Sequence, residues 1–135
     1  MKPICIFGIF VADLCFFSNT IPTRGQTVLG SKHLVGPGGK GSNQAIAAAR
    51  LGGDVKFITK LGKDNHAEMA LALYKNSGMQ TNTIIQDSSL TTGVAGIMIS
   101  LFVINTLILT QRTGCVLCSK PVHNTISMVT MRTFG

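Results

Sequence analysis

The stretch of sequence that decides the fold runs from Gly36 to Gly52 and reads GPGGKGSNQAIAAARLG. It opens with four glycines in six residues, which let the backbone turn sharply and approach a ligand closely because glycine has no Cβ. The run from Asn43 to Leu51 is rich in helix formers, Ser42 is a suitable N-cap, and Gly52-Gly53 supplies a stop signal. We therefore predict a glycine-rich turn that leads directly into a helix.

The residue spacing of this turn is similar to that of two phosphate-binding motifs. The spacing G-x-G-x-x-G from Gly36 to Gly41 matches a dinucleotide-binding loop, but Pro37 and Gly39 are atypical within that motif. The P-loop motif fails because Lys40 is followed by glycine where the motif needs Ser or Thr. Neither motif assigns a nucleotide phosphate to the turn.

A small polyhydroxylated ligand suits the turn better. A helix start offers free backbone N–H groups, and Lys40 and Asn43 would add a cationic donor and an amide at the same mouth. The alternative is a tight strand-to-helix turn that carries a solvated lysine. From the residues alone, both interpretations stay open.

Outside this stretch, strand and helix patterns alternate along the chain. A turn with a capping residue at 62–65 precedes a second predicted helix at 66–76, which Gly78 ends. Strand patterns occupy residues 4–10, 26–35, 55–59, 83–86 and 92–100. This order predicts an α/β fold built from βαβ units. From Arg112 onward no period is recognisable, so we divide the chain into a domain at 1–111 and a tail at 112–135.

Composition excludes several classes of protein. The chain is 45% hydrophobic and 13% charged, which is typical of a domain with a real core. Its net charge of +7 comes from a shortage of acids, and the twelve Lys and Arg residues are scattered without a basic run. With one Tyr and no Trp to stack on bases, we predict no nucleic-acid partner.

Cysteine spacing and one apolar segment bear on location. Cys115 and Cys118 form a lone CxxC without the further ligands that zinc requires, so we expect no metal site and free thiols in a reducing cytoplasm. Residues 88–111 carry no charge after Asp87 and could span a bilayer. Their β-branched content fits two buried strands joined by a turn, which leaves a membrane-anchored peptide as the alternative.

The run from Gly38 to Gly52 closely resembles the first signature of the ribokinase-like (PfkB) carbohydrate kinases, and it is most similar to the ribokinase branch. Further segments resemble the family in the family's own order, and they lie at Gly8–Asp13, Pro22–Val28, Leu61–Asp64, Thr92–Ala95 and Asn105–Thr110. The resemblance covers residues 3 to 111. It implies a Rossmann-like ribokinase fold with a small β-sheet lid, truncated after its N-terminal half.

The resemblance also implies a substrate and a set of residues. In this family ATP, with Mg²⁺, phosphorylates a sugar hydroxyl, and the sugar lies between the core and the lid. The substrate-binding residues would be Asp13, Gly38, Gly39, Lys40 and Asn43. Val11 stands where the ribokinase branch has an asparagine, so one amide partner for a ribose-like, pentose-like sugar is missing.

The family's second signature, Asp-Thr-x-Gly-Ala-Gly-Asp, does not occur in the 135 residues, and no carboxylate follows Asp87. Phosphoryl transfer needs a base within reach of the attacking hydroxyl, so we name no catalytic residue. The resemblance implies a sugar kinase and thus a transferase, but we expect this chain alone to be inactive and its ATP site to be missing. We interpret the change near Arg112 as a frameshifted or alternatively spliced end. The alternative function is a non-catalytic sugar-binding module, or one that dimerises through its lid strands.

Overall fold

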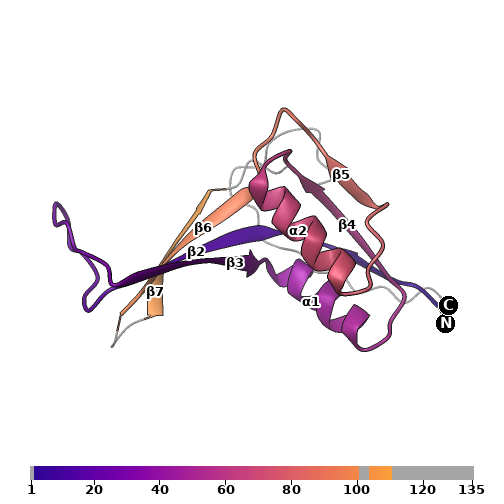
Figure 1. Ribbon diagram of the computed structural model, residues 1–135, viewed down its shortest axis with the longest axis horizontal. Coiled ribbons are helices and arrows are strands. Elements are labelled where there is room, and N and C mark those ends of the chain that lie inside the picture. Colours follow the sequence, from indigo (N-terminus) through magenta and orange to yellow (C-terminus); the bar gives the residue numbers. More distant parts are fainter. Residues whose placement is uncertain (1, 101–103, 111–135) are drawn as a thin grey trace.

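The computed structural model describes residues 2–100 and 104–110. Seven strands and two helices follow one another as β1 (Ile4–Phe7), β2 (Val11–Phe17), β3 (Lys32–Gly38), α1 (Lys40–Arg50), β4 (Val55–Leu61), α2 (Asn65–Asn76), β5 (Ile84–Gln86), β6 (Gly93–Ile99) and β7 (Ile104–Thr110). They form two sheets, a core sheet in the order β1-β4-β5 and a lid sheet in the order β3-β2-β6-β7. Figure 1 shows the lid sheet extending away from the core sheet and the two helices. The α/β class and the separate small sheet were both predicted.

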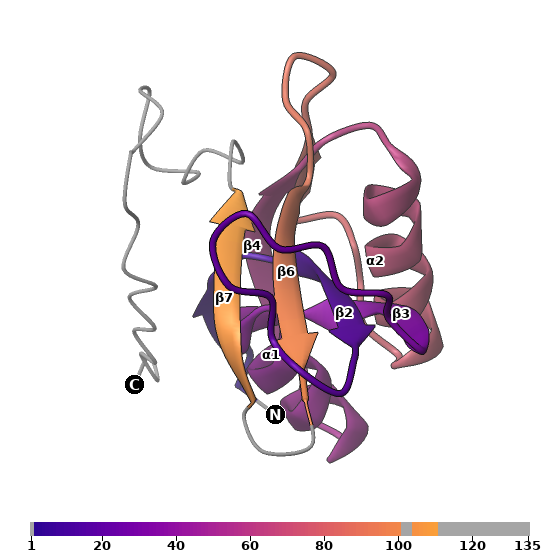
Figure 2. The same cartoon turned by 90° about the vertical axis from the view of Figure 1, so that its left-hand side faces the viewer.

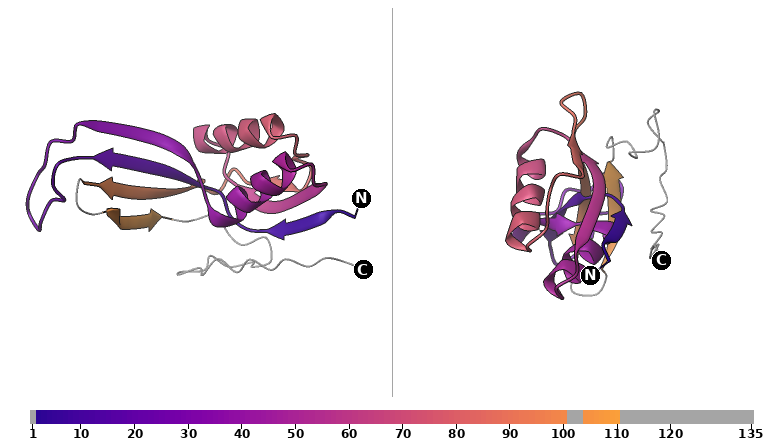
Figure 3. Two further views of the ribbon diagram at one scale, coloured as in Figure 1. Left: turned by 90° about the horizontal axis from the view of Figure 1, so that it is seen from below. Right: turned by 90° about the vertical axis from the view of Figure 1, so that its right-hand side faces the viewer.

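The core sheet is parallel, and α1 and α2 lie on the same face of it (Figure 3). Side chains alternate along β4, so that Phe57 and Leu61 are buried and Ile58 is half-buried on the opposite face. Tyr74 of α2 lies at the centre of the core, with its ring 5.5 Å from that of Phe57 and 6.4 Å from that of Phe10. Burial of these large side chains against the helices stabilises this half of the molecule.

The lid sheet is mixed. β2 pairs with β3 in antiparallel and with β6 in parallel fashion, and β6 pairs with β7 in antiparallel fashion. Figure 2 looks along the lid and shows β7, β6, β2 and β3 side by side. The apolar segment at 88–111 therefore contains two strands, as its β-branched residues indicated. Within the described ranges no helix is long and apolar enough to cross a membrane.

The first predicted strand is wrong as a single element. Residues 4–10 divide into β1 and a crossing at 8–10, after which β2 enters the other sheet. The apolar pattern continues through the crossing because Phe10 is also buried, at 1% exposure. The strand predicted at 26–35 is shifted as well, since β3 begins at Lys32 and ends at Gly38. Gly36 and Gly38 therefore belong to a strand, and only Gly39 forms the turn.

The predicted cap of the first helix is also wrong. The N-cap residue of α1 is Gly39, with φ 95°, and the helix already begins at Lys40. Ser42 is fully buried inside the helix, where its hydroxyl lies 3.0 Å from the Tyr74 hydroxyl of α2. The predicted ends are confirmed, because Gly52 and Gly78 both adopt positive φ just after a helix.

Two predictions fall beyond the described residues. The tail at 112–135 and the Cys115–Cys118 pair lie outside them. The two cysteines within them, Cys5 and Cys15, are free and half-buried.

Candidate functional site

Asp13 lies in the middle of the lid sheet. In the register of β2 it is paired with Gly36 of β3 on one side and with Ala95 of β6 on the other. The carboxyl group is half-buried, and this burial raises its pKa above the ordinary value. The lid therefore holds one carboxylate that has lost part of its hydration, which favours a ligand able to donate hydrogen bonds to it.

Gly38 provides the space for that carboxylate. It pairs with Val11, two residues before Asp13, so both positions face the same side of the sheet. A Cβ added to Gly38 would lie 2.5 Å from Asp13 Cγ and would also overlap both carboxylate oxygens. The structure thus brings together two of the five predicted residues, and it explains why the last residue of β3 is glycine.

Gly39 joins the lid to the first helix. Its φ of 95° is strained for any residue with a side chain. A Cβ there would lie 3.1 Å from Phe10 Cα and would overlap the Ile9 carbonyl oxygen. Next to it, a Cβ on Gly41 would lie 2.8 Å from Gly8 Cα. The glycines of the motif therefore let two crossings between core and lid pack directly against each other.

Lys40 and Asn43 are exposed on the first turn of α1. The backbone N–H of Asn43 donates to the Gly39 carbonyl at 2.9 Å. Within the described residues, the structure records no contact between either side chain and Asp13. The site therefore consists of an Asp13–Gly38 pair in the lid and of donors at the adjacent helix start. Such a set can accept hydrogen bonds from hydroxyl groups and donate hydrogen bonds to them.

A polar junction at the start of β6 was only partly predicted. A cap was expected within residues 62–65, and Asp64 supplies it, because its Oδ1 accepts from the Ala67 amide at 2.9 Å. Its Oδ2 also accepts from the Thr92 amide at 2.8 Å, across 28 residues of sequence. No local pattern signals this second bond, although Asp64 and Thr92 both lie in segments that resemble the family.

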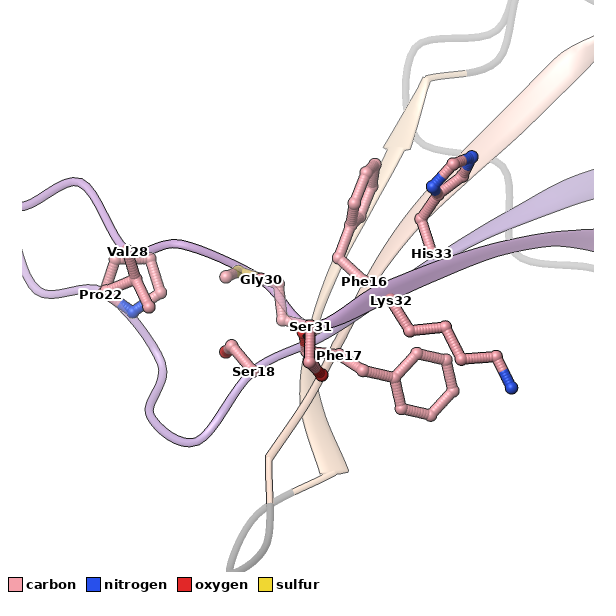
Figure 4. A pocket seen from close by; sticks show the side chains of 10 residues that line it. Phe16, Phe17, Ser18, Pro22, Val28, Gly30, Ser31, Lys32 and His33 are labelled. Carbon is pink, nitrogen blue, oxygen red and sulfur yellow. Dashed lines mark hydrogen bonds between the residues drawn. The ribbon is translucent and has the colours of Figure 1, made fainter.

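A surface hollow of about 420 Å³ lies at the far end of the lid, and none of the five predicted residues lines it (Figure 4). Its wall includes Phe16, Phe17 and His33, and the Lys32 ammonium lies 5.5 Å from the centre of the Phe17 ring. Among the described residues no group of three or more His, Cys, Asp or Glu side chains could hold a metal ion.

Comparison with known proteins gives consistent matches. Residues 1–113 match the family described as pfkB family carbohydrate kinase. The ribokinase of Bacillus subtilis (strain 168) is 38% identical over 100 residues, which cover 74% of this chain and 34% of that protein. The deoxyribokinase of Salmonella typhi is 33% identical over 97 residues, covering 72% of this chain and 32% of that protein.

Solved structures match in the same region. The ribokinase of Giardia lamblia superposes with a TM-score of 0.72 at 35% identity, covering 81% of this chain and 33% of that one. The Arabidopsis thaliana ribokinase complexed with ribose and ATP gives a TM-score of 0.73 at 27% identity, covering 81% and 36%. This chain spans about a third of the length of these proteins. It has the N-terminal part of the ribokinase fold, and it belongs to the pfkB family of carbohydrate kinases.

Proposed function

We propose that this chain is the sugar-binding part of a ribokinase-type kinase, whose whole reaction is the ATP-dependent phosphorylation of a hydroxyl group on a pentose-like sugar. The observation that carries the proposal is the half-buried Asp13 carboxylate lying against Gly38, next to the start of α1. The names of the relatives, which include ribokinase and deoxyribokinase, support a five-carbon sugar.

Each predicted residue has a distinct role in this proposal. Asp13 accepts hydrogen bonds from sugar hydroxyls, and such charge-assisted bonds are stronger than neutral ones. Gly38 and Gly39 let the sugar approach the backbone, while Lys40 and Asn43 donate from the helix start. The buried Val11 stands two residues before Asp13 and offers no hydrogen bond. The site therefore has one polar contact fewer for a sugar hydroxyl than an asparagine there would provide.

We further propose that residues 1–111 form this binding unit, separate from 112–135, and that the 135 residues alone do not phosphorylate the sugar. No Asp or Glu follows Asp87, so the sequence offers no carboxylate base beyond that point. ATP and Mg²⁺ are implied by the family, but the described residues include no group of three or more His, Cys, Asp or Glu side chains that could hold a metal ion. We place the protein in the cytoplasm, where Cys5 and Cys15 would remain reduced thiols.

Calorimetric titration with ribose and with 2-deoxyribose tests this proposal. We expect the 135-residue chain to bind one of them and the D13A variant to bind about 100-fold more weakly, because a hydrogen bond to a charged group contributes about 1.5–3 kcal/mol. A coupled assay with ATP and Mg²⁺ should detect no turnover. Equal sugar affinity of the wild type and D13A would contradict the role of Asp13. Measurable turnover would contradict the proposal that the chain lacks a catalytic base.

A dimerisation module is the second candidate. Phe16 and Val35 lie on one face of the lid sheet and are 48% and 49% exposed, which leaves large apolar side chains uncovered there. A second copy of the chain could cover them lid against lid. Sedimentation equilibrium of the wild type and of F16S/V35S decides this point. A dimer that the two substitutions dissociate supports the module, and a monomeric wild type removes it.

A further inference from the structure

Within the described residues, the chain passes between core and lid at three places (Figure 1). The crossing at 8–10 leads from β1 to β2, Gly39 leads from β3 to α1, and residues 87–92 lead from β5 to β6. The first two are packed against each other through Gly8 and Gly41. The third arrives from a different part of the core, where its backbone packs against Gly62 and the Asp87 amide donates to the Leu61 carbonyl at 2.9 Å.

A side chain also holds the third crossing, at its lid end. The Asp64 carboxylate binds the two amides on either side of it at once, with Oδ1 accepting from Ala67 and Oδ2 accepting from Thr92. Thr92 makes a second bond to the core, in which its Oγ1 accepts from the Gly62 backbone N–H at 3.1 Å. These bonds close a ring between the end of β4, the start of α2 and the start of β6. Thr92 is 3% exposed, so little water reaches its side of the ring, whereas Asp64 is half-buried.

The backbone around the ring is packed too closely to shift without breaking it. A Cβ on Gly62 would lie 2.6 Å from the Leu90 carbonyl oxygen and 2.8 Å from the Thr92 nitrogen. Burial alone would raise the pKa of the Asp64 carboxyl group, but the hydrogen bonds from Thr92 and Ala67 outweigh it and lower that pKa. The group that both amides address is therefore the ionised carboxylate.

The position of the ring connects it to the sugar site. Thr92 directly precedes Gly93, the first residue of β6, and Gly93 pairs with Val11 of β2. β2 carries Asp13 two residues further on, where it is paired with Ala95 of β6. The position at which β6 leaves the core therefore influences the placement of β2. Because β2 carries Asp13, it also influences how Asp13 lies relative to the start of α1.

We propose that Asp64 is a positioning residue for sugar binding. Its carboxylate holds the third crossing to the core and so fixes the lid relative to the glycine turn. This inference deepens the proposed function and rests on it for the link to the sugar. The competing explanation is that Asp64 only caps α2. The two explanations differ in which amides depend on the residue, so they can be separated.

The test is amide hydrogen exchange, followed by NMR, on the full chain and on D64S. Serine is a good N-cap and keeps a bond to Ala67, but its single oxygen cannot also hold Thr92. We expect exchange in β2 and β6 of the lid to accelerate about 10- to 100-fold, while the amides of α2 keep their protection. Sugar affinity should fall with lid protection, although Asp64 does not touch the sugar in the proposed site.

D87S is the matched control. Asp87 lies in the same crossing and also accepts from a backbone amide, that of Ser89 at 3.0 Å, but it pairs with Lys60 of the core and not with the lid. Lid exchange in D87S should equal that of the wild type. Equal acceleration of lid and α2 in D64S, or no acceleration in either, would overturn the inference. Because exchange is measured without sugar, a chain that binds no sugar would count against the proposed function and leave the exchange result valid.

Discussion

The core sheet and the lid sheet are stabilised differently. In the core, helices cover one face, and Phe57, Leu61 and Tyr74 are completely buried. In the lid, Phe16, Leu34 and Val35 remain about half exposed on strands that no described helix covers. The core therefore depends on side-chain burial, whereas the lid depends on strand pairing and on its crossings to the core. Substitutions should affect folding in the first region and ligand binding in the second.

The largest expected effect tests the core half of this contrast. F57A removes a fully buried ring that packs edge-on against Tyr74, and we expect a loss of about 3–5 kcal/mol in the free energy of unfolding. F16A in the lid, where the ring is 48% exposed, should lose less than about 1 kcal/mol. Urea denaturation of both variants checks this. Similar losses of unfolding free energy in the two variants would show that lid side chains are stabilised by burial as much as core side chains are, which would contradict the contrast between the two sheets.

A second substitution tests whether the lid acts through ligand geometry. G38A places a methyl group on the Asp13 carboxylate, so Asp13 must move. We expect sugar binding to weaken about 10- to 100-fold, with an unfolding cost of about 1–3 kcal/mol from overpacking.

G36A is the control for this substitution. It lies in the same strand, two residues away, and nothing is within 4 Å of its added Cβ. Both affinity and unfolding should stay close to the wild type. If G36A weakened sugar binding as much as G38A, then glycine content in β3 rather than space for Asp13 would explain the result.

The sequence predicted the elements that depend on local signals. Both helices, their glycine stops and a cap within residues 62–65 were found because these features lie within a few residues of one another. The division of residues 4–10 between two sheets was missed, because the buried Phe10 continues the apolar run through the crossing. The cap of α1 was misplaced because Gly39 uses a positive φ rather than a side chain to begin the helix.

The site followed the same rule. Resemblance to the family supplied the five residues, but their arrangement comes from strand register, which no local pattern contains. Gly38 lies against Asp13 only because β2 and β3 pair with Val11 opposite Gly38. The bond from Thr92 to Asp64 spans two elements and likewise appears only after folding. The residues were therefore predictable, whereas the contacts between strands were not.

The smallest expected effect on stability concerns Asp13 and sets function against folding. Because burial raises the pKa of this carboxyl in the folded chain, its contribution to stability is fully present below the unfolded pKa of about 3.8 and is lost as pH rises through the folded pKa. D13N removes the charge, so at pH 7 we expect the midpoint of thermal unfolding to rise by about 1–4 °C, while at pH 3 the two proteins should unfold alike. The pKa values of Asp64 and Asp87 are lowered by their hydrogen bonds, but both groups are common to the two proteins and cancel in the difference. Sugar binding should weaken in D13N although the protein is more stable. A D13N variant that is less stable than the wild type at pH 7 would contradict this account.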